Sequence, residues 1–297
     1  MRVPAKVNLA LQVAPRRPDG YHDLRTVFCS VSLYDTLVCR PIIGDALRLT
    51  VLGRQAALIP HDGTDLTVRA ARLLRDRFGQ ATTGVHMTLT KSIPVAGGMA
   101  GGSADAAAAL IGCNALWHLG VGDEGLHALA RELGADVPFG LLGGVALGEG
   151  RGDVLTPLPA PIKLIWVLAF SSQRLSTAEV FAAYDTQLSD SVPVALDGLR
   201  RALAAGDALA VAGHLSNDLE GPAVRLLPPL RETLDYGRRL DGVLGAVLSG
   251  SGPTCAFLCA EEGVTKSIAS ALASLPQVSG TRVVTGPALP ANPCISA

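Results

Sequence analysis

Apolar and polar side chains alternate over residues 3–14, with the period of two that is typical of a β-strand. Val7 and Leu9 lie on one face of this predicted strand, and Lys6 and Asn8 lie on the other. The pattern predicts a strand with one buried face. Lys6 and Asn8, two residues apart, could line a site together. The alternative is an edge-strand lysine that discourages aggregation.

The rest of the chain interleaves segments with strand-like and helical patterns, which predicts an α+β fold. Strands are predicted over residues 26–38, 46–52, 85–90, 163–170, 243–248, 254–259 and 281–284. Helices are predicted over residues 65–78, 103–118, 123–133, 177–184, 198–205, 223–240 and 261–275. A Leu-Pro-Ala-Pro run at residues 158–161 is the predicted boundary between domains of residues 1–158 and 159–297.

A glycine-rich turn, PVAGGMAGG at residues 94–102, directly precedes one of the predicted helices. Glycine backbones can approach a ligand closely, and the free N–H groups at a helix start bind anions, so the turn favours a phosphate cradle. Ser103 is the predicted N-cap of the helix, and Asp105 is expected to compensate its dipole, although both are also placed to contact a metal ion. The spacing matches neither the P-loop nor the dinucleotide fingerprint. On composition alone, a flexible loop before an alanine-rich helix stays possible.

Asp136 lies in the run GADVPF, between a predicted helix end and Pro138. Because the residue before a proline is biased toward extended backbone, Val137 is predicted to be extended. Asp136 would then stand on a stiff corner among apolar residues, where a carboxylate can act as a general base for a hydroxyl. An ordinary turn aspartate is the alternative.

Two further turns carry candidate chemistry. The turn at residues 19–20 is followed by Tyr21 and His22, a pair predicted to be exposed, which could stack on a flat ring and hydrogen-bond its edge. A surface aromatic beside a satisfied histidine is the alternative. The turn SGSGPT at residues 249–254 joins two predicted strands. It is either a plain hairpin turn or a second glycine wall that packs beside the glycine-rich turn at residues 94–102.

Composition and charge disfavour several classes of protein. The net charge is −1 and no basic stripe is present, which disfavours a nucleic-acid-binding protein. No apolar run is long enough to span a bilayer, and the N-terminus has no secretory pattern. Cys113, Cys255 and Cys259 lie in apolar or small-residue runs and are predicted to be buried thiols. We therefore expect a cytoplasmic protein that binds neither nucleic acid nor membrane. The sequence specifies no oligomeric state.

Taken together and in this order, the motifs from residue 4 to about residue 258 resemble the GHMP kinase superfamily. The runs PAKVNL, RPDGYHDL and GADVPF resemble most closely a branch that acts in the non-mevalonate isoprenoid pathway on a small molecule carrying a cytidine diphosphate group. The resemblance implies ATP-dependent phosphorylation of a hydroxyl, with Mg²⁺ accompanying ATP. It also implies an N-terminal domain like domain 2 of ribosomal protein S5 and a ferredoxin-like C-terminal domain.

The resemblance assigns roles to particular residues. Asp136 would be the catalytic base, and Lys6 would activate it and stabilise charge. Four residues would bind the substrate: Tyr21 and His22 would receive the cytosine, Asn8 would lie nearby, and Phe181 would close over the base. The ATP-binding segment would be Pro94, Val95, Ala96, Gly97, Gly98, Met99, Ala100, Gly101, Gly102, Ser103 and Ala104. No residue is assigned as a metal ligand.

Three other functions stay open from the sequence. A GHMP kinase for another alcohol, such as mevalonate or homoserine, would have no need of the ring-stacking pair Tyr21 and His22. A nucleotide-binding sensor without catalysis would have no need of both Lys6 and Asp136. A dinucleotide-dependent oxidoreductase is disfavoured by the spacing of the glycines.

Overall fold

Two long antiparallel strands form the centre of the first β-sheet. The computed structural model of this chain describes residues 1–60, 63–79, 84–186 and 196–290. Within it, β1 (Arg2–Arg16) pairs antiparallel with β2 (His22–Ile42). The sheet has seven strands, with the order β3-β4-β2-β1-β8 and with β5 pairing both β2 and β6. The other strands are β3 (Leu47–Leu52), β4 (Gly84–Thr90), β5 (Val145–Glu149), β6 (Val154–Pro157) and β8 (Ser216–Asn217).

Strand β1 is buried on both faces, so the prediction of one buried face was wrong. Val7 and Leu9 are fully buried, as the alternation predicted. Lys6 and Asn8 on the opposite face are only 5% and 2% exposed. This face is covered because the turn that joins β9 to β10 of the second sheet folds onto it, with the Ser249 hydroxyl 3.4 Å from the Lys6 carbonyl oxygen.

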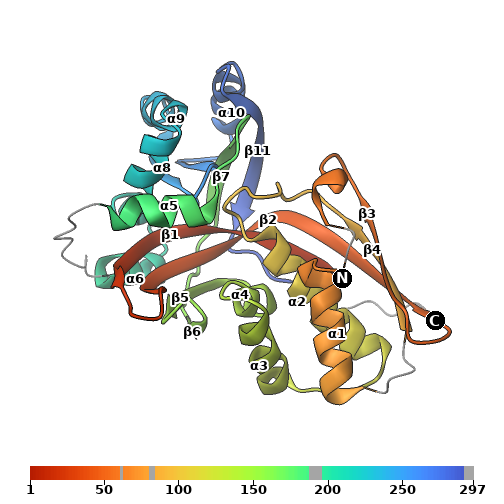
Figure 1. Cartoon of the computed structure of the whole chain (residues 1–297). Helices are drawn as coiled ribbons and strands as arrows, with labels where there is room; N and C mark the ends of the chain where they lie inside the picture. The colour runs from red at the N-terminus through yellow and green to blue at the C-terminus, as the bar shows by residue number, and fades with distance from the viewer. Residues whose placement is uncertain (61–62, 80–83, 187–195, 291–297) are drawn as a thin grey trace.

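Helices cover the first sheet on the side away from the second one (Figure 1). They are α1 (Leu66–Phe78), α2 (Gly101–Leu116), α3 (Asp123–Leu133) and α4 (Val137–Leu142). Helix α1 is capped by Asp65, whose carboxylate accepts a hydrogen bond from Thr67 N at 2.8 Å. Helix α2 is rich in buried alanine, and these small side chains let it pack closely against α1, β1 and β2.

The helix starts near the glycine turn and Asp136 differ from the predictions. Helix α2 begins at Gly101, two residues before the predicted N-cap Ser103. Its cap is Ala100, in left-handed conformation (φ 56°), and no side chain caps it, because the turn's own backbone delivers the chain into the helix. Val137 is helical and not extended, because a proline in the first turn of a helix is tolerated.

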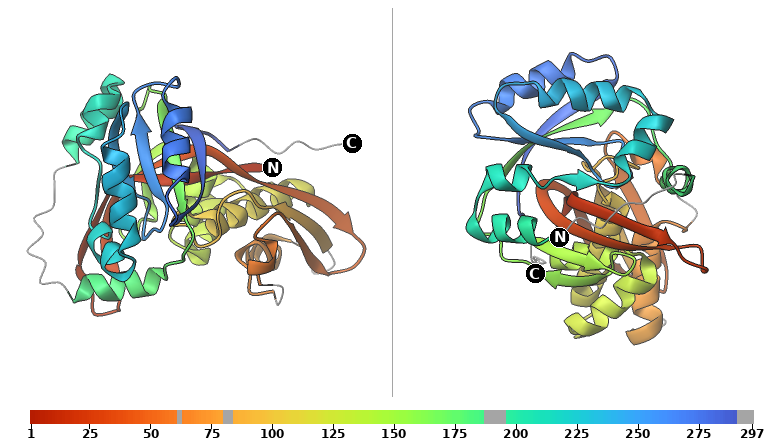
Figure 2. Two further views of the ribbon diagram at one scale, coloured as in Figure 1. Left: turned by 90° about the horizontal axis from the view of Figure 1, so that it is seen from above. Right: turned by 90° about the vertical axis from the view of Figure 1, so that its left-hand side faces the viewer.

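The second sheet has four antiparallel strands in the order β11-β7-β10-β9, which is the ferredoxin-like arrangement. Its strands are β7 (Leu164–Ser171), β9 (Val243–Leu248), β10 (Cys255–Cys259) and β11 (Val278–Gly286). Helices α9 (Pro229–Arg238) and α10 (Thr265–Ala273) cover its outer face (Figure 2). On its inner face pack α6 (Asp197–Ala205) and α7 (Ala208–Ala212).

The helix predicted over residues 223–240 is two helices, α8 (Glu220–Leu226) and α9. Pro228 and Pro229 separate them, because proline lacks the N–H that a continuing helix needs. The predicted domain boundary at residues 158 and 159 stays a prediction. The largest hydrophobic cluster contains residues from both sides of it, among them Leu110 and Trp166.

Candidate active site

A cleft of about 1050 Å³ lies where the first sheet, the two glycine turns and α5 (Thr177–Asp185) meet. Most of the predicted site residues line it, although they come from distant parts of the chain. They are Lys6, Asn8, Tyr21, His22, Pro94, Ala96, Gly97, Gly98, Ala100, Gly101, Gly102, Ser103, Asp136 and Phe181. Three residues of the predicted ATP segment, Val95, Met99 and Ala104, do not line it. Met99 and Ala104 are buried in the core instead.

Lys6 and Asp136 face each other in this cleft, with Lys6 Nζ 3.9 Å from Asp136 Oδ2. Lys6 Nζ also donates a hydrogen bond to Asn8 Oδ1 at 2.6 Å. Asn8 Nδ2 in turn donates to Thr26 Oγ1 at 2.8 Å, and Thr26 donates to the Ala10 carbonyl at 2.7 Å. This chain of buried hydrogen bonds fixes both the Lys6 ammonium and the Asn8 amide in one orientation.

The Lys6 ammonium is held in an apolar setting. Its side chain is buried, and the ring of Phe28 lies 5.5 Å from Nζ. Burial lowers the pKa of Lys6 below its ordinary value, and the nearby Asp136 carboxylate opposes that shift. A charge in such a low-dielectric place acts strongly on a developing negative charge beside it.

Asp136 sits at the start of α4 with ordinary helical backbone angles (φ −87°, ψ −10°). Its side chain makes no capping hydrogen bond to the helix and is 35% exposed toward the cleft. Helix α4 therefore holds Asp136 rigidly, which the sequence analysis had expected of an extended segment before Pro138. The carboxylate is left in position to accept a proton from a bound hydroxyl.

The two glycine turns interlock next to Lys6 and Asp136. Of the two predictions for residues 249–254, the second glycine wall is confirmed. The turn does join β9 to β10, and it also packs on the first turn: Ser249 Oγ donates to the Gly98 carbonyl at 3.0 Å. Gly98 has a φ of 72°, and a Cβ there would come within 2.2 Å of the Ser249 carbonyl oxygen. A Cβ on Gly250 would lie 3.1 Å from Lys6 Nζ. Only glycine lets the turns approach each other and Lys6 this closely.

The N-terminus of α2 points its free N–H groups at the cleft through Gly101, Gly102 and Ser103. No acidic residue lies in the first turn of this 16-residue helix, so its positive end is uncompensated and suits an anion. The prediction that Asp105 compensates the dipole was wrong, because Asp105 is buried and its Oδ2 accepts from Lys91 Nζ at 2.6 Å.

A buried charge cluster of Lys91, Asp35 and Asp105 lies behind the glycine turn. Lys91 Nζ bonds both carboxylates, and Asp35 Oδ1 also accepts from the backbone N–H groups of Ser92 and Ile93 at 2.6 and 2.9 Å. Burial alone would lower the pKa of Lys91, but the two carboxylates raise it above its ordinary value. The charged Lys91 therefore links the segment before the glycine turn to Asp35 of β2 and Asp105 of α2.

At the other end of the cleft, Tyr21 is 57% exposed, whereas His22 is only 7% exposed. The prediction of an exposed pair was therefore wrong for His22, because its ring is wedged between β1 and α5. His22 Nδ1 lies 2.8 Å from the Ala14 carbonyl oxygen, and its ring stacks on that of Phe181 at 5.3 Å between centroids.

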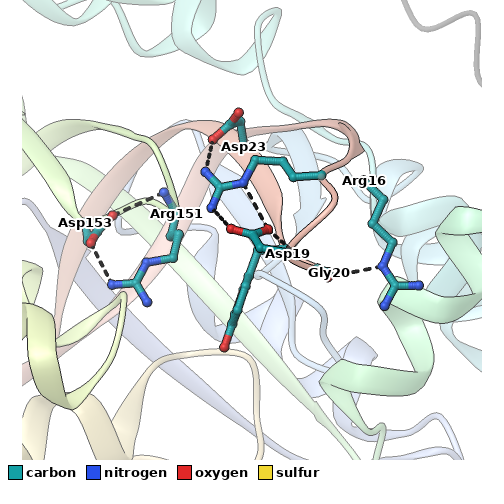
Figure 3. A network of polar contacts seen from close by, with 8 residues as sticks. Arg16, Asp19, Gly20, Asp23, Arg151 and Asp153 are labelled. Atoms are coloured by element: carbon teal, nitrogen blue, oxygen red, sulfur yellow. Dashed lines mark hydrogen bonds and ion pairs between the residues drawn. The ribbon is translucent and has the colours of Figure 1, made fainter.

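Charged side chains at the cleft rim hold the turn that carries Tyr21 (Figure 3). Tyr21 N donates to Asp19 Oδ1 at 3.0 Å, and Arg17 bonds the carboxylates of both Asp19 and Asp23. The hydrogen bonds from Arg17 lower the pKa of Asp19. On the other side, the Arg151 guanidinium lies 6.0 Å from the Tyr21 ring centroid.

Many cleft residues were missed from the sequence, among them Thr26, Phe28, Arg151 and Asp185. Thr26 gave a weak signal, as a polar residue at the start of a predicted strand. Phe28 and Asp185 carry no local pattern, because their partners Phe139 and His22 are distant in sequence. Arg151 bonds the nearby Asp153, but its place beside the Tyr21 ring is set by the fold.

Comparison with known proteins shows the family of this chain. The family described as GHMP kinases N terminal domain matches residues 65–144, and GHMP kinases C terminal matches residues 196–276. The 4-diphosphocytidyl-2-C-methyl-D-erythritol kinase of Nocardia farcinica is 48% identical, covering 97% of this chain and 93% of the relative. This chain belongs to the 4-diphosphocytidyl-2-C-methyl-D-erythritol kinase family of GHMP kinases.

Other members and neighbours of the family extend the comparison. The kinase of the same name from Thermobifida fusca is also 48% identical, over 97% of this chain and 95% of its own length. A crystal structure of 4-(cytidine 5'-diphospho)-2C-methyl-D-erythritol kinase superposes with a TM-score of 0.81 at 37% identity, covering 97% and 100% of the two chains. Homoserine kinase from Cytophaga hutchinsonii, at 20% identity and TM-score 0.78 over 96% and 92%, shares the GHMP kinase fold.

Within the described residues, no helix has the length and apolar character needed to cross a bilayer. The same residues hold no group of three or more histidine, cysteine or acidic side chains suited to a metal ion.

Proposed function

We propose that this GHMP kinase transfers the γ-phosphoryl group of ATP to the 2-hydroxyl of 4-diphosphocytidyl-2-C-methyl-D-erythritol. The observation that carries the proposal is the Lys6–Asp136 pair, 3.9 Å apart, beside two interlocked glycine turns in one cleft. A carboxylate to take the hydroxyl proton, a phosphate cradle and a buried cation are the parts that phosphoryl transfer needs.

In the proposed reaction the substrate hydroxyl oxygen attacks the γ-phosphorus, and the bond from that phosphorus to the bridging oxygen of ADP breaks. The hydroxyl proton passes to the Asp136 carboxylate. The Lys6 ammonium stabilises the negative charge that builds up between the attacking oxygen and the phosphoryl group. Asn8, bonded to Lys6 at 2.6 Å, keeps that ammonium aimed at the reacting end.

The phosphates of ATP would bind the N–H groups at the start of α2 and in the glycine turn, where no acidic side chain repels them. Mg²⁺ bound with ATP would neutralise phosphate charge, and it commonly keeps several waters and needs few protein ligands. Ser103 is the one hydroxyl group on the first turn of α2 that could contact it.

The cytidine end of the substrate would lie between Tyr21 and Phe181, both of which line the cleft. Aromatic rings that line a cleft suit a flat base. Both nitrogens of His22 already face protein oxygens, those of Ala14 and Asp185, so its imidazole would hold the wall in place and not hydrogen-bond the base edge.

The test is ADP formation by the purified chain with ATP and a panel of alcohols. We expect turnover with 4-diphosphocytidyl-2-C-methyl-D-erythritol and background rates with mevalonate and homoserine. Preferred turnover of mevalonate or homoserine would contradict the substrate assignment. ADP formation with none of the three, despite ATP binding, would favour the non-catalytic sensor.

A further inference from the structure

Helix α5 is tied to the cleft at both of its ends. At its start, Thr177 Oγ1 lies 2.8 Å from Ser251 Oγ, which belongs to the second glycine turn. Near its end, the buried Tyr184 hydroxyl donates to the Val13 carbonyl of β1 at 2.5 Å. The last residue of the helix, Asp185, places Oδ1 3.2 Å from His22 Nε2. The helix therefore spans the cleft from the phosphate end to the base end.

Both ring nitrogens of His22 face oxygen atoms. The Ala14 carbonyl near Nδ1 can only accept, so Nδ1 carries a proton. The Asp185 carboxylate near Nε2 also accepts. These two contacts hold the ring in one orientation between β1 and the end of α5. The Asp185 carboxylate is 3.7 Å from Arg16 as well.

The contact between Asp185 and His22 also determines where Phe181 stands. Phe181 precedes Asp185 by four residues and so lies on the same face of α5. Its ring stacks on His22 with 28° between the planes. One histidine is thus held by the helix through a charged contact and a ring contact. Because Tyr184 still bonds Val13, loss of the Asp185 contact would leave the helix end in place and free the His22 ring that packs on Phe181.

We propose that Asp185 is a positioning residue for the base end of the cleft, acting through His22 to hold Phe181 across from Tyr21. This inference rests on the proposed function, because it assumes that a pyrimidine nucleotide occupies that end. Asp185 itself makes no contact with the reacting hydroxyl in this arrangement. Its removal should therefore weaken binding of the cytidine part and leave the phosphoryl transfer step intact.

The experiment measures binding of CDP by calorimetry, together with steady-state kinetics, for the wild type and Asp185→Asn. Asparagine keeps the shape and removes the charge. We expect CDP to bind about tenfold more weakly and the KM for the alcohol substrate to rise similarly, since the contact of the Asp185 carboxylate with His22 is lost. The kcat and the KM for ATP should stay near wild type. Glu179→Gln removes the same charge from an exposed position of α5 outside the cleft and should change neither constant.

A double-mutant cycle tests whether Asp185 acts through His22. In a His22→Asn background, Asp185→Asn should weaken CDP binding little further. Equal CDP binding by wild type and Asp185→Asn, or full additivity with His22→Asn, would overturn the inference and leave the proposed function standing. Failure of the wild type to bind CDP would overturn both. An unchanged thermal midpoint in Asp185→Asn shows that the binding loss is not unfolding.

Discussion

At the residue scale, the proposed chemistry depends on two side chains that reach one place by different routes. Lys6 comes from the middle of a buried strand, and Asp136 comes from the start of a short helix. Each was recognisable in the sequence from its neighbours, because a lysine in an apolar strand and an aspartate before Val-Pro are both unusual. Their separation of 3.9 Å was not predictable, because the folding of the whole intervening chain sets it.

Asp136→Asn should lower kcat by about 10²–10⁴, the usual cost of losing a positioned base. The KM for ATP should change little, because the phosphate cradle lies on other elements. Steady-state ADP release with saturating ATP measures both. Asp123→Asn, at an exposed position on α3 outside the cleft, is the matched control and should turn over normally. Near-normal kcat in Asp136→Asn would remove the carboxylate from the mechanism.

The depressed pKa of Lys6 predicts a particular alkaline limit. Activity needs the charged ammonium, so kcat should fall as pH rises through the lowered pKa, below the 10.5 of an ordinary lysine. In Lys6→Arg, whose guanidinium stays charged, this decline should move to higher pH in whatever activity remains. A pH profile of kcat for both proteins measures this. An identical alkaline limb in the two would assign it to another group.

The lowered pKa of Lys6 also affects stability, which is expected to rise with pH where the activity falls. Between the lowered pKa and 10.5, unfolded Lys6 binds a proton that folded Lys6 has released. The contribution of Lys6 to the free energy of unfolding therefore rises with pH in that window. Burial of the Lys6 ammonium thus costs stability at neutral pH.

At the element scale, most helices and strands are explained by the pattern of apolar residues, and the errors have local causes. Helix α3 and strand β9 have the predicted bounds. The errors at Val137 and Pro228 both come from proline, which is tolerated in the first turn of a helix but ends a helix when it falls in the interior. Ser103 was misplaced because a left-handed turn needs no side-chain cap, and no sequence pattern distinguishes the two kinds of helix start.

Gly98→Ala should destabilise the protein by about 2 kcal/mol or more, because the left-handed φ is unfavourable for alanine and its Cβ would strike the Ser249 carbonyl. Gly102→Ala is the matched control in the same turn. Its Cβ would meet only Leu66 at 3.9 Å, and stability should be kept or slightly raised. Thermal and denaturant unfolding compare the two. Equal stability of both variants would show that the turns do not interlock as described.

Lys91→Met should destabilise the protein by about 3–5 kcal/mol, because it leaves Asp35 and Asp105 buried without their cation. The comparison is Lys163→Met, which breaks an exposed ion pair with Glu262 and should leave the unfolding midpoint unchanged. Urea unfolding of both proteins gives the two values. A small effect at Lys91 would mean that the two carboxylates are protonated or reached by water.

At the scale of the whole molecule, the two halves of the chain are joined by a shared hydrophobic cluster and by a strand of the second half that pairs in the first sheet. Leu11 and Val13 of β1 belong to the hydrophobic cluster under the second sheet. Strand β8, from the C-terminal half, pairs in parallel with β1 through Ala10 and Leu11. Trp166 of the second sheet is fully buried in the cluster that also holds the helices of the first. The order of motifs in the sequence predicted two domains. Nothing in it indicated that a strand from the second half pairs with β1, or that residues of both sheets share a hydrophobic cluster.

This shared core predicts that the chain unfolds in one cooperative step, despite its two sheets. Calorimetry should give a single transition with equal calorimetric and van't Hoff enthalpies. A fragment of residues 1–158 should lack fixed tertiary structure by near-UV circular dichroism, because it exposes the surfaces that β7 and β8 cover. Two resolved transitions, or a folded fragment, would mean that the lobes are independent. Because the cleft is walled by both lobes, cooperative unfolding also means that no substrate-binding half survives alone. CDP binding and the fluorescence of the two tryptophans, Trp117 and Trp166, should therefore change at the same denaturant concentration.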